Sequence, residues 1–135
     1  MLEINNKTKF KINSKELGGI TEKFLSQYRK KNKEISLALL GEKKMKELNN
    51  IYRGKNYVTD ILSFAGEDGF LGELIICPKQ IERQARLLKH SFKKEFVFIF
   101  VHGLLHLVGY TDETEKKKLD MIKRGEEFIY KISKL

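Results

Sequence analysis

The segment from Lys93 to Val108 constrains the fold most, because apolar side chains would lie around nearly the whole circumference of a helix there. Such a helix is stable only when other elements cover it on several sides, so the pattern predicts a central, buried helix. Gly109 is well placed to end that helix, since glycine adopts a positive φ at no steric cost. The stretch from Phe96 to the residue before Asp112 has no Lys, Arg, Asp or Glu, but it is shorter than the ~20 residues of a membrane span. We therefore expect a soluble protein.

Four short apolar runs, bounded by charged or turn-forming residues, predict β-strands. The third and fourth runs are separated by the turn Gly66–Gly69, so we expect those two strands to pair. The four runs are Leu2–Asn5, Glu34–Leu40, Asp60–Phe64 and Phe70–Cys77.

Apolar residues at helical spacing predict further helices between and after these strands. The resulting order, βαβαββααα, predicts an α+β fold, an α/β sandwich in which a mixed sheet of about four strands is covered by about five helices. The first additional helix is expected to begin at Ser14, or nearer Thr21 because two glycines weaken its first turns. The others are expected to begin at Glu42 (ending near Tyr52), at Pro78, and at Asp112 or Thr114.

The helix that begins at Pro78 is expected to be amphipathic. Its basic face would consist of Lys79, Arg83, Arg86 and His90, and its core face of Ile81, Ala85 and Leu88. The basic face could follow a phosphate backbone or be an ordinary exposed face, and we expect His90 to be a solvated surface residue.

Length and composition limit the class of protein. The chain has 135 residues, one proline and no Gly/Ser-rich linker, so we expect a single domain over residues 1–135. Its single cysteine, Cys77, excludes a disulfide within the chain and favours a buried thiol in a reducing, cytoplasmic setting. No apolar stretch near the N-terminus is long enough for a signal peptide. A formal net charge of +9 favours polyanionic partners such as RNA, DNA or a ribosomal surface, although Lys-rich surfaces also occur without one.

Two histidines and an aspartate in the segment VHGLLHLVGYTDE define the candidate chemistry. His102 and His106 are four residues apart, so their rings lie on one helix face, the spacing with which zincin metalloproteases bind Zn²⁺. Gly109 lets the chain turn back and brings Asp112 toward the same point. Two imidazoles and a carboxylate suit Zn²⁺, or another divalent transition metal, and leave a fourth position open for water. The sequence therefore predicts one metal ion per chain on a zincin-like helix.

Two observations limit this interpretation. A histidine on an apolar helix is often a core residue with hydrogen-bond partners, since each imidazole buried without one would cost about 1–3 kcal/mol. The zincin pattern also has a glutamate directly after the first histidine as the general base, whereas Gly103 occupies that position here. Ordinary metalloprotease chemistry is therefore disfavoured.

Three segments resemble the YbeY family of single-strand-specific metallo-endoribonucleases: LNNIYRGKNYVTDILSF (Leu48–Phe64), LGELIIC (Leu71–Cys77) and HGLLHLVGY (His102–Tyr110). The resemblance spans the chain from about Ile35 to Glu113. It implies a similar order of elements, with the metal helix packed near the sheet. It also implies single-stranded RNA and ribosomes as partners, with roles in 3′-end maturation of small-subunit ribosomal RNA and in ribosome quality control.

The chain departs from the family at the third ligand. The family pattern continues after Gly-Tyr with Asp and a third His, where this sequence has Thr111 and Asp112. We expect Asp112 to take the place of the third ligand and to alter metal affinity or preference.

Arg53 has two interpretations from the residues alone. Its planar guanidinium can bind phosphate oxygens and stabilise charge that develops on them, or it can pair with Asp60 or cap a loop. The family resemblance implies the first, a pocket arginine important for activity. We assign no catalytic role to Asp60, Ser63 or Glu73.

Two other functions remain open. Another metal-dependent hydrolase, such as a peptidase with a displaced base, would share the metal site but not the preference for polyanions. A non-catalytic ribosome-assembly factor would hold a structural metal or none, and the aspartate at position 112 adds weight to that alternative.

Overall fold

The structure is a computed structural model and describes residues 1–133. Within that range it contains four strands and five helices, which confirms the predicted α+β class. The elements are β1 (Leu2–Asn6), α1 (Ser14–Gln27), β2 (Glu34–Leu39), α2 (Glu42–Arg53), β3 (Ile61–Ala65), β4 (Phe70–Ile76), α3 (Pro78–Leu88), α4 (Phe92–Leu107) and α5 (Glu115–Ser133).

The four strands form one mixed sheet in the order β1-β2-β4-β3. β1 and β4 each run parallel to β2, and β3 pairs antiparallel with β4 across the predicted turn. β3 is therefore an edge strand whose start, at Ile61, pairs with Ile76 at the end of β4.

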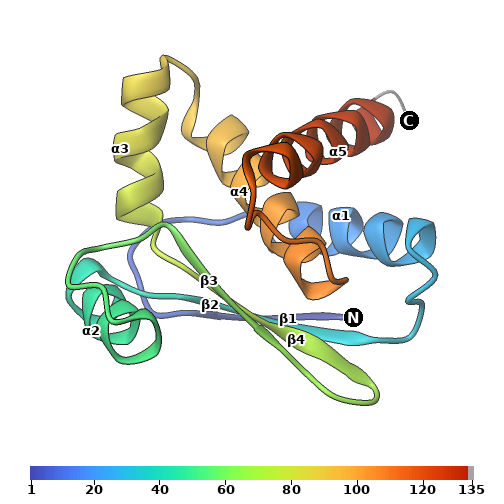
Figure 1. Cartoon of the computed structure of the whole chain (residues 1–135), viewed down its shortest axis with the longest axis horizontal. Coiled ribbons are helices and arrows are strands. Elements are labelled where there is room, and N and C mark those ends of the chain that lie inside the picture. Colours follow the sequence, from blue (N-terminus) through green and yellow to red (C-terminus); the bar gives the residue numbers. More distant parts are fainter. Residues whose placement is uncertain (134–135) are drawn as a thin grey trace.

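The two faces of the sheet bury different sets of side chains, because successive residues of a strand point to opposite faces. Figure 1 shows α1, α4 and α5 on one side of the sheet, and α2 apart from them near one end. Residues such as Leu37 and Leu74 join the larger core with α1, α4 and α5. Ile75 and Cys77 join a smaller cluster with Met45 of α2. Cys77 is fully buried, as predicted, and burial raises the pKa of its thiol.

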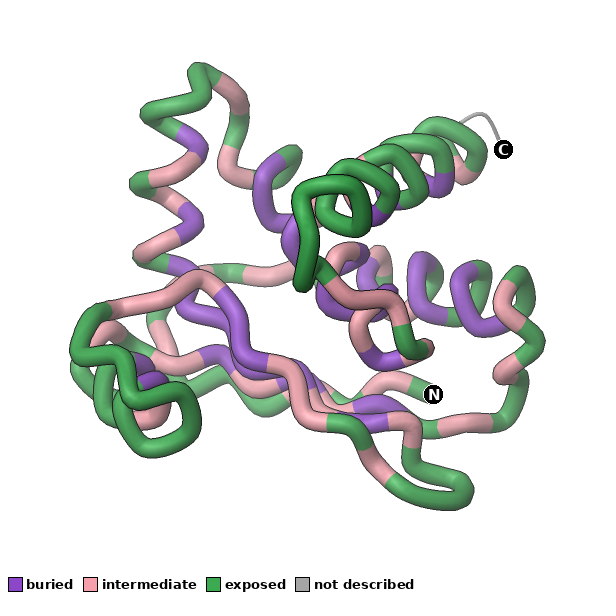
Figure 2. Tube along the Cα trace, in the orientation of Figure 1, coloured by how far each residue is buried: buried purple, intermediate pink, exposed green. Residues whose placement is uncertain are grey.

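α4 is the central helix that the apolar pattern predicts, and Figure 2 shows purple, buried positions along its length. It lies close against the sheet at Gly103. A Cβ at that position would lie 2.6 Å from Cδ1 of Ile61 and 2.9 Å from Cδ2 of Leu74. Position 103 is thus one point where the helix touches β3 and β4, and an added side chain there would force its neighbours to move.

Of the two predicted starts of α1, Ser14 is confirmed: the side chain of Asn13 accepts a hydrogen bond from the backbone N–H of Glu16 and caps the first turn despite the two glycines. The expectation for Leu88 of α3 was wrong. Leu88 is exposed rather than part of the core. It ends α3, which stands away from the sheet in Figure 1 and packs mainly on α4. Ala85 of the same turn is buried, so Leu88 lies on the side of that turn that is left in solvent.

None of the helices within residues 1–133 is long and apolar enough to span a membrane.

Candidate metal centre

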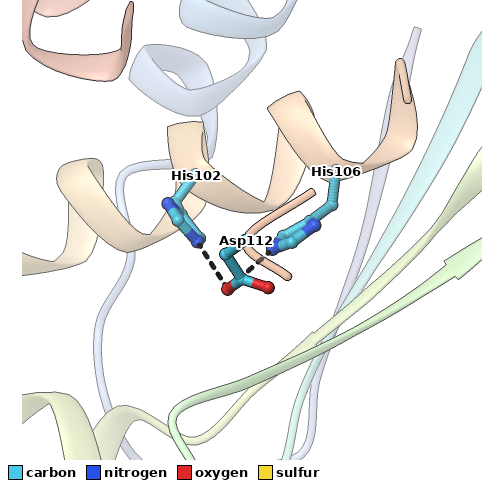
Figure 3. Close-up of side chains that lie close together, drawn as sticks. All are labelled: His102, His106 and Asp112. Carbon is cyan, nitrogen blue, oxygen red and sulfur yellow. Dashed lines mark ion pairs between the residues drawn. The ribbon is translucent and has the colours of Figure 1, made fainter. Parts of the chain in front are cut away.

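The C-terminal end of α4 and the turn after it bring the three predicted ligands together. His102 and His106 lie one turn apart on α4, and Gly109 has a φ of 106°. The backbone N–H of Tyr110 donates to the carbonyl of Leu105 at 3.1 Å, which folds the chain back beside the helix. Asp112 follows that turn and, as Figure 3 shows, its carboxylate points toward both imidazoles.

A single carboxylate oxygen of the aspartate lies between the two rings. Oδ2 of Asp112 is 3.9 Å from Nε2 of His102 and 3.7 Å from Nε2 of His106. One possible ligand atom from each of the three residues lies within 4.8 Å of the other two. Tetrahedral ligands at about 2.0–2.1 Å from a zinc ion are about 3.3–3.5 Å apart, so small side-chain rotations would bring these atoms to coordination distance. The donor set and its spacing fit a divalent transition metal.

The ring of His106 is oriented by the turn that carries the aspartate. Nδ1 of His106 lies 3.1 Å from the carbonyl oxygen of Tyr110 and donates to it in the matching tautomer. That tautomer leaves the lone pair of Nε2 free on the side of Asp112. The Tyr110 ring is itself held, since it packs edge-to-face on Tyr28 and lies 4.6 Å from the guanidinium carbon of Arg124. The sequence pattern gave no sign of this contact, because the acceptor is a backbone carbonyl.

Burial sets the protonation state of His102. Desolvation lowers the pKa of this imidazole below its usual value, and the neighbouring His106 acts in the same direction. Asp112 and Asp60 act in the opposite direction and do not outweigh burial. A lowered pKa keeps His102 neutral near pH 7, the form that binds a metal.

The site is nevertheless open to solvent on one side. The side chains of His102 and His106 are 18% and 25% exposed, whereas that of Asp112 is 50% exposed. A ligand set of this kind leaves space for water or a substrate oxygen beside the carboxylate.

A polar network connects the start of β3 with α3 and α4. Nε2 of Gln84 donates to Oδ2 of Asp60 at 3.2 Å and to Oε2 of the buried Glu95 at 3.1 Å. Glu95 in turn lies 2.9 Å from Nε2 of His90. The expectation that His90 is a solvated surface residue was therefore wrong: it is half-buried because the carboxylate of Glu95 needs a partner away from water. Helical spacing alone did not predict this contact.

Arg53 is not part of the triad's contacts. It is the last residue of α2, is exposed, and precedes Gly54, whose φ of 67° ends the helix. Within residues 1–133 it forms no ion pair with Asp60 or with the triad. Arg53 belongs to α2, which packs in the smaller hydrophobic cluster, whereas the two histidines belong to α4, which packs in the larger core.

The basic face predicted on α3 is largely neutralised. Arg83 pairs with Glu42 of α2, and Glu82 lies 2.9 Å from Lys79 and 3.8 Å from Arg86. Of the two interpretations, these pairs favour an ordinary exposed face.

The fold and this cluster define an α+β protein with a candidate transition-metal centre on its central helix. Residues 3–133 match a protein-family model described as endoribonuclease YbeY. The chain therefore belongs to the endoribonuclease YbeY family, which confirms the resemblance inferred from its three motifs.

Individual relatives agree with that assignment. A protein named endoribonuclease YbeY from Phytoplasma australiense is 38% identical over 98% of this chain and 95% of its own length. One of the same name from Thermodesulfovibrio yellowstonii is 37% identical over 93% of this chain and 92% of its own length. The solution structure of TM1509 from Thermotoga maritima is similar with a TM-score of 0.66 and 29% identity, over 99% of this chain and 92% of that one.

Proposed function

We propose that this chain is a single-strand-specific metallo-endoribonuclease that acts in the 3′-end maturation of small-subunit ribosomal RNA and in ribosome quality control. The observation that carries the proposal is the convergence of His102, His106 and Asp112 in a member of an endoribonuclease family. We further propose that residues 1–135 form one metallohydrolase domain, that it works in the cytoplasm, and that single-stranded RNA and the ribosome are its partners.

The proposed cofactor is one Zn²⁺ per chain, or another divalent transition metal, held by His102, His106 and Asp112. The donor set supports this, since two neutral imidazoles and a carboxylate suit zinc and leave an open position. When bound, such an ion supplies Lewis acidity toward a phosphoryl oxygen and lowers the pKa of water to about 7.

The protein's own residues would position the RNA and stabilise charge. Arg53 is exposed and has no carboxylate partner within residues 1–133, so its guanidinium is available to bind phosphate oxygens bidentately. We assign it the stabilisation of negative charge that develops on the phosphate during cleavage. The net charge of +9 supports a polyanionic substrate.

Two features disfavour the alternatives. Position 103, where a zincin peptidase has its glutamate, is filled by a glycine in contact with Ile61 and Leu74, so no base can stand there. A structural metal is usually enclosed by four protein ligands, whereas these three ligands with a half-exposed carboxylate leave a position open, which favours an enzyme over an assembly factor with a structural metal.

Cleavage assays test the proposal. Purified protein should cleave single-stranded RNA, but neither duplex RNA nor casein, and EDTA should abolish the cleavage. His106→Ala should lose activity while it remains folded by circular dichroism, and His90→Gln, which keeps a hydrogen-bond donor for Glu95, is the control outside the triad. Cleavage of casein without RNA would replace the proposal with the peptidase alternative. Ribosome binding with no cleavage by the wild type would favour the assembly factor.

A further inference from the structure

Two exposed tyrosines flank Arg53 at the C-terminal end of α2. Tyr52 and Tyr57 are 61% and 54% exposed, and between them the chain carries Arg53 and Lys55. We call these four residues the aromatic–cationic surface. Figure 2 shows α2 and the segment after it largely in green, so this surface faces solvent.

The Tyr52 ring and the backbone of Tyr57 are held in place, although both side chains are exposed. Tyr52 packs edge-to-face on Phe64 of β3, with ring centroids 4.9 Å apart. The backbone of Tyr57 is fixed because Nδ2 of the fully buried Asn49 donates to its carbonyl at 2.9 Å. The backbone N–H of Lys55 donates to the carbonyl of Asn49 at 3.4 Å. A ring fixed before binding loses little conformational entropy when a ligand stacks on it.

The positive charge of this surface is not compensated by carboxylates. Within residues 1–133, Arg53 and Lys55 form no ion pair, and the Lys55 ammonium lies 6.0 Å from the centre of the Tyr57 ring. The cations of α3, in contrast, pair with Glu82 and Glu42. An incoming phosphate would therefore find unpaired cations here but not on α3.

The surface leads along the chain to the candidate metal centre. Tyr57 precedes Asp60 by three residues, and the charge of Asp60 acts on His102. The next residue, Ile61, touches α4 at Gly103. A single strand of RNA that crosses the aromatic–cationic surface toward β3 would therefore approach the triad.

We propose that the aromatic–cationic surface binds single-stranded RNA by stacking unpaired bases on Tyr52 and Tyr57, while Arg53 and Lys55 contact the phosphates beside them. The inference rests on the proposed function and assigns the residues that select unpaired RNA. Exposed aromatic rings beside cations bind single strands of any sequence, because every base has a π-face. The bases of a duplex are already stacked on one another, so a duplex cannot use the rings.

Binding of a 2′-O-methyl RNA oligonucleotide in EDTA tests the inference without any cleavage. Tyr52→Leu and Tyr57→Leu should each weaken binding by about 5- to 150-fold, because base stacking on an aromatic ring contributes that much. Tyr52→Phe and Tyr57→Phe retain the ring and should bind within about twofold of the wild type. Tyr130→Leu, which removes an exposed tyrosine of α5, is the matched control and should bind like the wild type.

An abasic oligonucleotide of equal length separates stacking from charge. It carries the same phosphates, so the leucine variants should bind it as the wild type does. Equal losses on the intact and abasic strands, or no loss on either, would overturn the inference. Because the assay needs neither metal nor turnover, a protein that binds as expected but does not cleave RNA would refute the proposed function and leave this inference standing.

Discussion

Replacing Gly103 with alanine tests how α4 is fitted to the sheet. The added Cβ would lie 2.6 Å from Cδ1 of Ile61 and 2.9 Å from Cδ2 of Leu74, both closer than ordinary van der Waals contact. The two neighbours are buried, so they can move little, and overpacking of this kind costs about 1–3 kcal/mol. Alanine also gains about 1 kcal/mol of helix propensity over glycine, which offsets part of that cost.

Two other helical glycines isolate the packing cost. A Cβ at Gly18 meets nothing within 4 Å, and one at Gly125 meets neighbours only at 3.8 Å and beyond. The gain in helix propensity is common to all three substitutions, so it cancels when their stabilities are compared. Gly103→Ala should therefore unfold with a free energy about 1–3 kcal/mol below that of Gly18→Ala or Gly125→Ala.

Urea denaturation followed by far-ultraviolet circular dichroism measures these differences. Equal slopes of free energy against urea concentration would show that the comparison is between similar folded and unfolded states. If Gly103→Ala proved as stable as Gly18→Ala, the close contact of α4 with β3 and β4 would be refuted. Close packing would then no longer explain why position 103 lacks the glutamate of zincins.

Three further predictions concern the candidate site. Arg53→Ala should slow RNA cleavage by about 10²- to 10³-fold with unchanged metal content, and an unchanged rate in a cleavage assay would remove Arg53 from the reaction. EDTA should lower the melting temperature of the metal-loaded protein. Where free metal had been about 100 times its Kd, the free energy of unfolding should fall by about 2.7 kcal/mol. The melting temperature of His102→Ala should not respond to EDTA. Burial lowers the pKa of His102 in the folded state, so the unfolded chain takes up the proton first. In EDTA, the free energy of unfolding should therefore stay constant above the pKa of histidine in the unfolded chain, about 6.5. It should decline as the pH falls from there through the pKa of His102 in the folded protein. Urea denaturation at pH 7.5 and at lower pH measures this loss of stability, and His102→Asn should show a smaller loss. An equal loss in His102→Asn would mean that other groups cause the pH dependence.

The parts of the fold that follow from local pattern were predictable. The apolar circumference of α4 required a buried helix, and short apolar runs gave all four strands to within a residue or two at each end. The triad was predictable because helix geometry fixes the His102–His106 spacing and Gly109 permits the turn to Asp112. These features depend on residues close in sequence.

The parts that depend on tertiary contacts were not predictable. Glu95 draws His90 out of solvent through a contact between α4 and the turn before it, and Gln84 adds a bond to Asp60 from another element. Leu88 has the spacing of a core residue, but its side chain at the end of α3 is 58% exposed. The periodicity of a single segment predicts neither the partial burial of His90 nor the exposure of Leu88.

Cobalt binding followed by visible absorption tests the central claim most directly, since the intensity of the bands reports the coordination number of Co²⁺ in place of zinc. The account predicts a wild type that binds one ion per chain with the intense bands of a low-coordinate site. Asp112→Ala should lose these bands, and Glu113→Ala, which removes the adjacent exposed carboxylate, should keep them. A wild type without bound cobalt, or an Asp112→Ala spectrum identical to that of the wild type, would contradict a centre built from His102, His106 and Asp112.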